Sequence, residues 1–200
     1  MTISRWILFL MLIIGITSCS HLTPPPATSE VKIPWKDRQT TLNSIHSFKI
    51  DGKIAVQTTR DSGSASVNWV QKGNQFNISL LGPLGSNGLK LTGQPGRVSL
   101  QTSDGKTYSA NSPEQLLAER WGFHLPVSNL NYWVRGLPVP GPAANTQFDN
   151  YGRLTQLVQQ GWNIQYQSYM RIGKIELPER IYVSSPSLKV KMVIYQWNIG

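Results

Sequence analysis

The sequence has 200 residues, of which 40% are hydrophobic and 14% charged, and its formal net charge is +9. This length fits one domain, and a single cysteine excludes an intrachain disulfide, so a hydrophobic core must stabilise the fold. The positive balance indicates an acidic protein partner or phospholipid headgroups, with a merely solvated basic surface as the alternative.

A short apolar leader opens the chain and ends at its only cysteine. Arg5 precedes an apolar run over 6–14, and Thr17 and Ser18 lead to Cys19. One positive charge, a short apolar run and small residues are typical of a secretory signal. The run is too short to span a bilayer, which takes roughly 20 apolar residues. We therefore predict a signal peptide over residues 1–18.

The end of this leader resembles the lipobox of bacterial lipoproteins. That similarity implies that diacylglycerol alkylates the Cys19 thiol, that the signal is cut before Cys19, and that the new amine is acylated. By the same analogy, Ser20 in place of an aspartate favours the outer membrane over the inner membrane. We expect a lipid-anchored protein that faces the periplasm, and this location excludes nucleic acid as a partner.

The segment behind the cysteine is poor in apolar residues and contains three consecutive prolines, Pro24 to Pro26. Such a composition predicts a lipidated flexible tether over 19–33. Pro34 then opens a helical stretch in which Trp35, Leu42 and Ile45 share one face, with Gln39 as a further candidate.

From Phe48 onwards the apolar residues recur with a period of two, which predicts an antiparallel meander. In the first strand Phe48, Ile50, Ile54 and Val56 share one face. The predicted strands lie around 48–57, 65–69, 76–80, 89–91, 98–100, 106–108, 146–149, 154–160, 162–167, 180–183 and 188–197. A sheet of about eleven strands closes or curls rather than staying flat.

A helical insertion interrupts the strands. Ser112 is a predicted N-cap before Pro113, and this helix should end near Gly122. Ser128 is the predicted N-cap of a second helix over 130–134, followed by a proline-rich loop up to residue 142. The helices need a partner for their apolar faces, and the mouth of a half-open barrel supplies one. The predicted fold is thus mainly β with an α lid, in a single domain over 34–200.

No residue constellation predicts catalysis. His21, His46 and His124 have no Cys, Asp or Glu at metal-ligand spacing, and the carboxylates are scattered along the chain. The glycine-rich segment 82–88 is followed by a predicted strand, whereas a phosphate loop needs a helix there. We therefore predict no enzyme activity, no metal site and no nucleotide.

Leu84 is an unusual residue for its place in the chain. Pro83 and Gly85 predict a tight turn, yet the residue between them is large and apolar. Either the loop folds back and buries Leu84, or Leu84 is one of many harmless exposed leucines.

Three stretches together resemble the outer-membrane lipoprotein receptor family LolB. The first runs from Trp35 to Val56 and includes 52–56 (GKIAV). The second joins 69–71 (WVQ) to 80–86 (LLGPLGS), and the third joins 122–138 to 189–197. Lys53 stands where an arginine is expected after the glycine, but the positive charge is kept.

The resemblance implies a half-open antiparallel barrel closed by a helical lid, with an apolar cavity and a fold like that of the soluble periplasmic carrier LolA. It also implies that the protein accepts acylated lipoproteins from that carrier and inserts them into the inner leaflet of the outer membrane. By motif position, Pro83, Leu84 and Gly85 would form the membrane-insertion loop. The implied partners are the carrier, the acylated cargo and outer-membrane phospholipid. No cofactor is implied besides the lipid on Cys19, and we expect a monomer.

Eight apolar residues of the predicted strands and lid are candidates for the cavity wall, although each could equally be packed in an ordinary core. They are Trp69, Ile78, Leu80, Leu89, Leu91, Leu125, Leu130 and Trp133. Two other functions stay open: a structural accessory lipoprotein of an envelope assembly machine, and a binder of free lipid or glycolipid.

Overall fold

The computed structural model describes residues 32–200, apart from 86–87 and 123, and residues 32–200 form a compact unit. The predicted signal peptide, Cys19 and all but the last two residues of the predicted tether lie outside the described residues.

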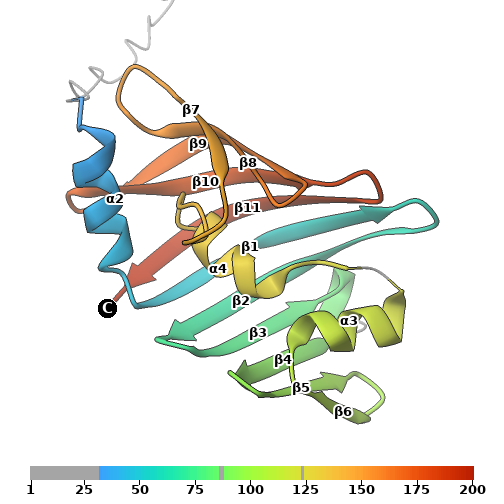
Figure 1. The fold of residues 1–200 in the computed structure, drawn as a ribbon. Coiled ribbons are helices and arrows are strands. Elements are labelled where there is room, and N and C mark those ends of the chain that lie inside the picture. The colour runs from blue at the N-terminus through green and yellow to red at the C-terminus, as the bar shows by residue number, and fades with distance from the viewer. Residues whose placement is uncertain (1–31, 86–87, 123) are drawn as a thin grey trace, which may run out of the picture. The chain divides into compact units, whose positions relative to one another are not determined.

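Within the described residues, one antiparallel sheet has the strand order β6-β5-β4-β3-β2-β1-β11-β10-β9-β8-β7 (Figure 1). Its strands are β1 Ser47–Thr58, β2 Ser62–Lys72, β3 Gln75–Leu81, β4 Leu89–Gln94, β5 Arg97–Thr102, β6 Thr107–Ala110, β7 Ala144–Phe148, β8 Leu154–Gln159, β9 Trp162–Ile172, β10 Ile175–Ser184 and β11 Leu188–Ile199. Strands β6 and β7 are the two edges and do not pair with each other, so the sheet is unclosed. The predicted strand number and the half-open barrel are confirmed.

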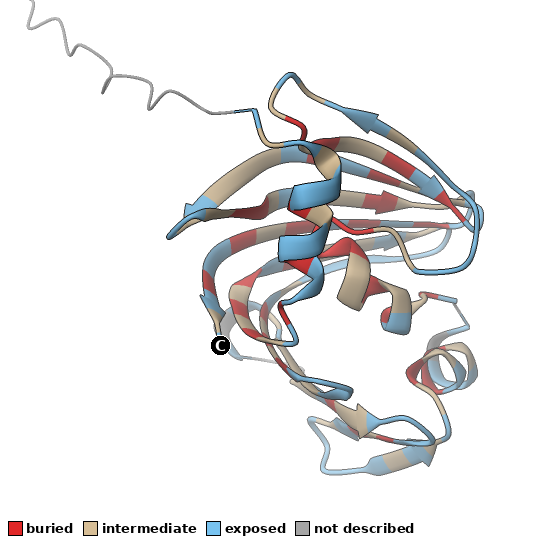
Figure 2. Cartoon of the chain, turned by 60° about the vertical axis from the view of Figure 1, so that its left-hand side comes forward, coloured by how far each residue is buried: buried red, intermediate tan, exposed pale blue. Residues whose placement is uncertain are grey.

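Three helices complete the described part of the chain: α2 Trp35–Asn43, α3 Pro113–Trp121 and α4 Val127–Trp133. Helices α3 and α4 belong to the connection between the two edge strands, and Figure 2 shows the sheet curving around α2 and α4. The buried apolar residues form one cluster that joins the inner face of the sheet to these helices. The helical insertion therefore covers the concave side, as the sequence predicted.

The alternation in β1 is confirmed, because Phe48, Ile50 and Ile54 are buried. The pairing of β1 with β11 shifts its register between Asp51 and Gly52, a bulge that increases the local twist of the sheet. At Gly52 the two backbones approach so closely that a Cβ would lie 2.2 Å from the carbonyl oxygen of Val193. Only glycine fits this close contact between the first and last strands.

The caps of α3 agree with the prediction. The Ser112 side chain accepts a hydrogen bond from the Gln115 N–H at 3.2 Å. Gly122 ends the helix in the left-handed conformation, at φ 69°. Such caps satisfy the backbone groups that the helix ends leave unpaired.

The N-cap predicted for the next helix was wrong. Helix α4 begins at Val127 with Pro126 at its N-cap, and the Pro126 carbonyl accepts the N–H groups of Asn129 and Leu130. Ser128 lies inside the helix instead, where its N–H donates to Glu114 Oε1 at 2.8 Å. That bond joins α3 to α4.

The first helix buries a residue that the sequence did not predict. Helix α2 buries Arg38 beside Leu42, whereas Gln39 is half-buried and Trp35 packs against the edge of the core. The Arg38 guanidinium donates to Glu176 at 2.9 Å and also to the Tyr151 carbonyl. A charged side chain can occupy a buried helix face when such partners compensate its charge.

Candidate functional site

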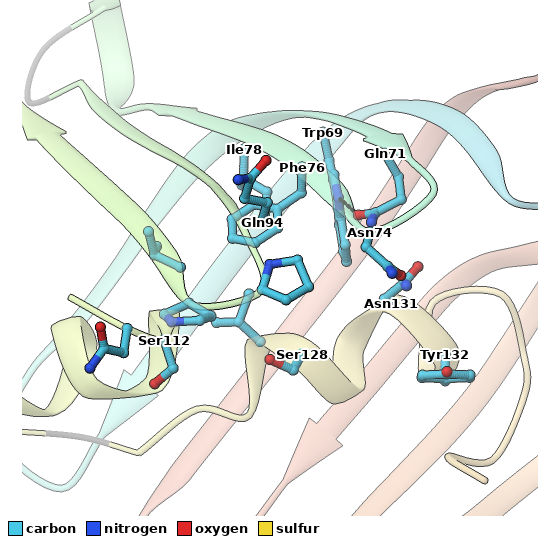
Figure 3. A pocket seen from close by; sticks show the side chains of 15 residues that line it. Trp69, Gln71, Asn74, Phe76, Ile78, Gln94, Ser112, Ser128, Asn131 and Tyr132 are labelled. Carbon is cyan, nitrogen blue, oxygen red and sulfur yellow. Dashed lines mark hydrogen bonds between the residues drawn. The ribbon is translucent and has the colours of Figure 1, made fainter. Parts of the chain in front are cut away.

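A cavity of about 370 Å³ lies between strands β2–β5 and the helical insertion (Figure 3). The residues that line it are Trp69, Gln71, Asn74, Phe76, Ile78, Gln94, Pro95, Val98, Asn111, Ser112, Pro113, Val127, Ser128, Asn131 and Tyr132. The sheet provides one wall, and the start of α3 together with α4 provides the other. This volume is at the lower end of the range of ligand pockets.

The apolar wall follows from the alternation along neighbouring strands. Trp69 on β2 lies directly opposite Ile78 on β3, and Phe76 lies opposite Gly93 on β4. A Cβ at Gly93 would lie 3.0 Å from the Phe76 ring, so the glycine leaves room for that ring. Pro113 and Val127 face this wall from the helices.

The structure divides the predicted wall residues into two groups. Trp69 and Ile78 line the cavity. The other six pack in or against the core: Leu91, Leu125, Leu130 and Trp133 are buried, and Leu80 and Leu89 are half-buried. A role for any of the eight in acyl binding stays a prediction.

Sequence reasoning missed the polar side of the cavity. Carboxamides line it from several elements, namely Gln71, Asn74, Gln94, Asn111 and Asn131, with the hydroxyls of Ser112 and Ser128. None of the described residues that line the cavity is charged, although the chain carries a net charge of +9. The cavity is therefore suited to an uncharged, amphipathic ligand.

The end of α4 is fixed to the strands beyond the cavity. The Tyr166 hydroxyl donates to the Trp133 carbonyl at 2.9 Å, and burial raises the pKa of Tyr166 well above its usual value, so it stays a donor. The buried Gln159 amide accepts from Trp133 Nε1 and the Val139 N–H, and donates to the carbonyls of Val139 and Pro142. These bonds hold one end of the insertion on β8 and β9.

Arg135, just after α4, connects the insertion to α2. Its buried guanidinium donates to the carbonyls of Ile45 at 2.8 Å, Leu42 at 3.3 Å and Asn131 at 2.8 Å. The first two are carbonyls at the end of α2, beyond the regular helical pairing, and the Leu42 carbonyl also accepts the Ile45 N–H at 3.3 Å. Burial lowers the pKa of Arg135.

The loop between β3 and β4 contains a short 3₁₀ turn, η1 (Pro83–Gly85). The Gly85 N–H donates to the Gly82 carbonyl at 3.1 Å, and Gly85 has φ 77°, as the predicted tight turn requires. The Leu84 side chain and residues 86–87 are outside the described part, so the insertion role of this loop stays a prediction. The segment leads into strand β4, in agreement with the prediction of a strand connection.

The described residues contain no candidate metal site. They contain no group of three His, Cys, Asp or Glu residues placed to hold a metal ion, and His46 and His124 are both exposed. None of the helices found in this part of the chain is long and apolar enough to cross a membrane.

The unclosed curved sheet with helices on its concave side defines a known class of fold. A LolA superfamily protein from Nitrosomonas europaea has a TM-score of 0.53, with 10% sequence identity over 84% of this chain and 94% of the other. A DUF1329 family protein from Desulfovibrio piger also has a TM-score of 0.53, with 7% identity over 82% and 91% of the two chains. The chain therefore shares its overall fold with these two proteins.

Sequence comparison specifies the family within this class. The family model "Outer membrane lipoprotein LolB" matches residues 46–197. The outer-membrane lipoprotein LolB of Pseudomonas syringae is 38% identical over 97% of this chain and 96% of the relative. That of Nitrosococcus oceani is 36% identical over 98% of each.

The chain belongs to the LolB family of outer-membrane lipoproteins. As a member of this family it is a receptor in lipoprotein localisation and not an enzyme, and the family implies a LolA-like carrier and lipoprotein cargo as partners.

Proposed function

We propose that this receptor takes the acyl chains of a lipoprotein from the carrier into its cavity and releases them into the inner leaflet of the outer membrane. The uncharged cavity between the sheet and the helical insertion carries this proposal. Exposing an acyl chain of about 15 methylenes to water costs on the order of 12 kcal/mol. The cargo must therefore pass from one apolar enclosure to the next.

The cavity must enlarge to hold a whole cargo. Its volume of about 370 Å³ is near the lower limit of the roughly 300–1,000 Å³ of pockets for drug-sized ligands, whereas the lipid of an acylated lipoprotein carries several acyl chains. The bonds of Tyr166 and Gln159 keep the far end of the insertion on β8 and β9. We propose that α3 and the start of α4 move away from β2–β5 while that far end stays in place.

The direction of transfer requires no nucleotide. It requires tighter acyl binding in the receptor than in the carrier, and tighter binding still in the membrane, where outer-membrane phospholipid is the acceptor. We propose that a monomer performs these steps while Cys19, freed from a signal peptide over 1–18, anchors it through a tether over 19–33. More than one acyl chain on Cys19 would make that anchor stable.

The acceptance step can be tested directly with residues 19–200 carrying Cys19→Ala, because residues 32–200 form a compact unit of their own. This protein is mixed with carrier loaded with an acylated lipoprotein, and a pull-down shows which protein holds the cargo. Movement of the cargo without nucleotide supports the proposal. Cargo that stays on a carrier of verified competence would instead support a structural accessory lipoprotein.

The second test separates acceptance from release. Leu84→Glu should leave acceptance of cargo from the carrier intact but block its release into vesicles, because a carboxylate is costly to bury among acyl chains. Tyr195→Glu is the matched control, since Tyr195 is 59% exposed and lies on β11. Equal loss of both steps in Leu84→Glu would show that Leu84 is only structural.

A binder of free lipid is the remaining alternative. A competition assay distinguishes this alternative from a lipoprotein receptor. Acylated cargo protein, the same protein without acyl chains, and free lipid compete for binding to the receptor. A lipoprotein receptor should prefer the acylated protein over both.

A further inference from the structure

One end of the cavity is formed by carboxamides rather than by apolar groups. Figure 3 shows Gln71, Asn74 and Asn131 gathered there, with the Trp69 ring beside them. These amides come from strand β2, from the turn after it and from helix α4. Sheet and insertion thus both contribute to the polar end.

The Gln71 amide is already fixed in place. Its Oε1 accepts from Trp69 Nε1 at 3.0 Å, and its Nε2 donates to the Gly73 carbonyl at 2.7 Å. The residue is buried, at 4% exposure. Gln71 therefore presents a rigid amide to the cavity, and one hydrogen of its NH₂ group remains for a ligand.

The Asn131 side chain is different because it has no partner within the described protein. Its Oδ1 is shielded from solvent and accepts no hydrogen bond from any described residue. Its main-chain carbonyl accepts from Arg135 Nε at 2.8 Å. A buried acceptor without a partner destabilises the folded state. Because this oxygen is shielded in the described conformation, a ligand N–H would reach it when the start of α4 moves away from β2–β5, as proposed above.

We propose that this carboxamide end, centred on Asn131, is a subsite for the neutral ester and amide groups that join acyl chains to an N-terminal cysteine. The inference rests on the proposed function and specifies which part of the cargo this site binds. A carboxamide both donates and accepts. It therefore matches ester carbonyls, which only accept, and an acylated amine, whose N–H donates.

The same chemistry discriminates against other lipids. A fatty acid carries a carboxylate and a phospholipid a phosphate, and no described residue around the cavity has a positive charge to compensate either. Transferring an uncompensated charge into such a site is costly. A site built for hydrogen bonds also rejects ligands that leave its polar groups unpaired.

The test uses residues 19–200 with Cys19→Ala and three probes: a triacylated cysteine peptide, palmitate, and diphenylhexatriene, an apolar dye without a polar head. Asn131→Leu should weaken binding of the triacylated peptide by roughly threefold to tenfold, the value of one hydrogen bond. It should leave dye binding unchanged and raise the melting temperature. Palmitate should bind the parent protein more weakly than the triacylated peptide does.

Ser168→Ala is the matched control, because the Ser168 hydroxyl is also buried without a described partner but does not line the cavity. It should raise the melting temperature and change no affinity. Unchanged peptide affinity in Asn131→Leu, or an equal loss of peptide and dye, would overturn the subsite. A lower melting temperature in that variant would also overturn it, because Asn131 would then be structural. If the parent protein binds neither peptide nor dye, the proposed function itself fails.

Discussion

At the residue scale, Gly52 occupies a close backbone contact between β1 and β11, the first and last strands along the chain. An alanine there would place its Cβ 2.2 Å from the Val193 carbonyl oxygen, and this oxygen belongs to a paired backbone that cannot easily move. We expect Gly52→Ala to cost about 2–4 kcal/mol of unfolding free energy. Equilibrium unfolding in denaturant measures this change in unfolding free energy. Gly63→Ala, where no atom lies within 4 Å of the new Cβ, should change stability little, and equal effects would contradict the argument.

Asp149 gives the protein a defined sensitivity to acid. Burial raises the pKa of this carboxyl, but hydrogen bonds from the Arg153 and Tyr151 backbone and from the Arg153 guanidinium outweigh that effect, so its pKa is lowered. The stability that it contributes is therefore complete above its unfolded pKa of about 4 and is lost as the pH falls through the lowered value.

We accordingly expect Asp149→Asn to be less stable than the parent protein at pH 7 and to lose less stability between pH 5 and about pH 2. Urea midpoints across this pH range measure the difference. Parallel curves for the two proteins would show that Asp149 does not contribute to the acid dependence.

Single residues also mark what the sequence alone could not predict. The period of two placed Trp69 and Ile78 correctly on the inner face of the sheet, and both line the cavity. The same pattern could not separate them from Leu91, which packs in the core, because alternation gives the face but not the distance to the helix opposite. The period of two also puts Gln71 on the face of Trp69, and Gln71 was missed because a polar side chain near a strand end is usually solvated. Asn131 was missed because a polar residue on a short helix indicates a solvent-facing position, whereas here it lines a cavity.

At the scale of elements, Arg135 holds α2 and the end of α4 together. We expect Arg135→Met to cost about 2 kcal/mol of unfolding free energy, because methionine keeps the apolar stem but removes the Arg135 donor from the Ile45 carbonyl. The Leu42 carbonyl also loses its bond from Arg135 and keeps the Ile45 N–H. The exchange rates of the backbone amide hydrogens along α2 should then increase. Arg120→Met is the comparison, since this arginine on α3 is exposed and lies over the Tyr108 ring. An equal loss of stability in both variants would mean that the cost comes from lost side-chain packing and not from the lost hydrogen bonds to the carbonyls.

The boundaries of elements were harder to predict than their number. Strand β10 begins at Ile175, five residues before the predicted start. The predicted start was too late because Pro178 interrupts the strand pattern in the sequence. The register against β9 shifts just after this proline, and the irregularity accommodates it. Helix α4 likewise begins before Ser128 because the Pro126 carbonyl already accepts the first helical N–H groups. The local sequence was compatible with the predicted and with the observed start of each element, and packing against the rest of the sheet selected the observed one.

At the scale of the whole molecule, location and transfer should be separable. We expect Cys19→Ala in the mature chain to leave a protein that no longer associates with membranes but accepts cargo from the carrier at the parent rate. The anchor determines where the receptor acts, while the compact unit over 32–200 carries the cavity. Membrane fractionation and the pull-down assay measure the two properties. Lost acceptance in the soluble variant would show that the lipid takes part in binding.

The strand order has a consequence for how the molecule forms. Strands β1–β6 and β7–β11 each pair with their sequence neighbours, so each half can assemble from local hairpins. Among the described strands, the pairing of β1 with β11 joins the two halves of the sheet, and it runs from Phe48 opposite Ile199 to Thr58 opposite Leu188. Such long-range pairing is slow, because the entropy of closing a long loop is lost before the contacts form. A chain that emerges N-terminus first therefore cannot join its two half-sheets until β11 (Leu188–Ile199) is available.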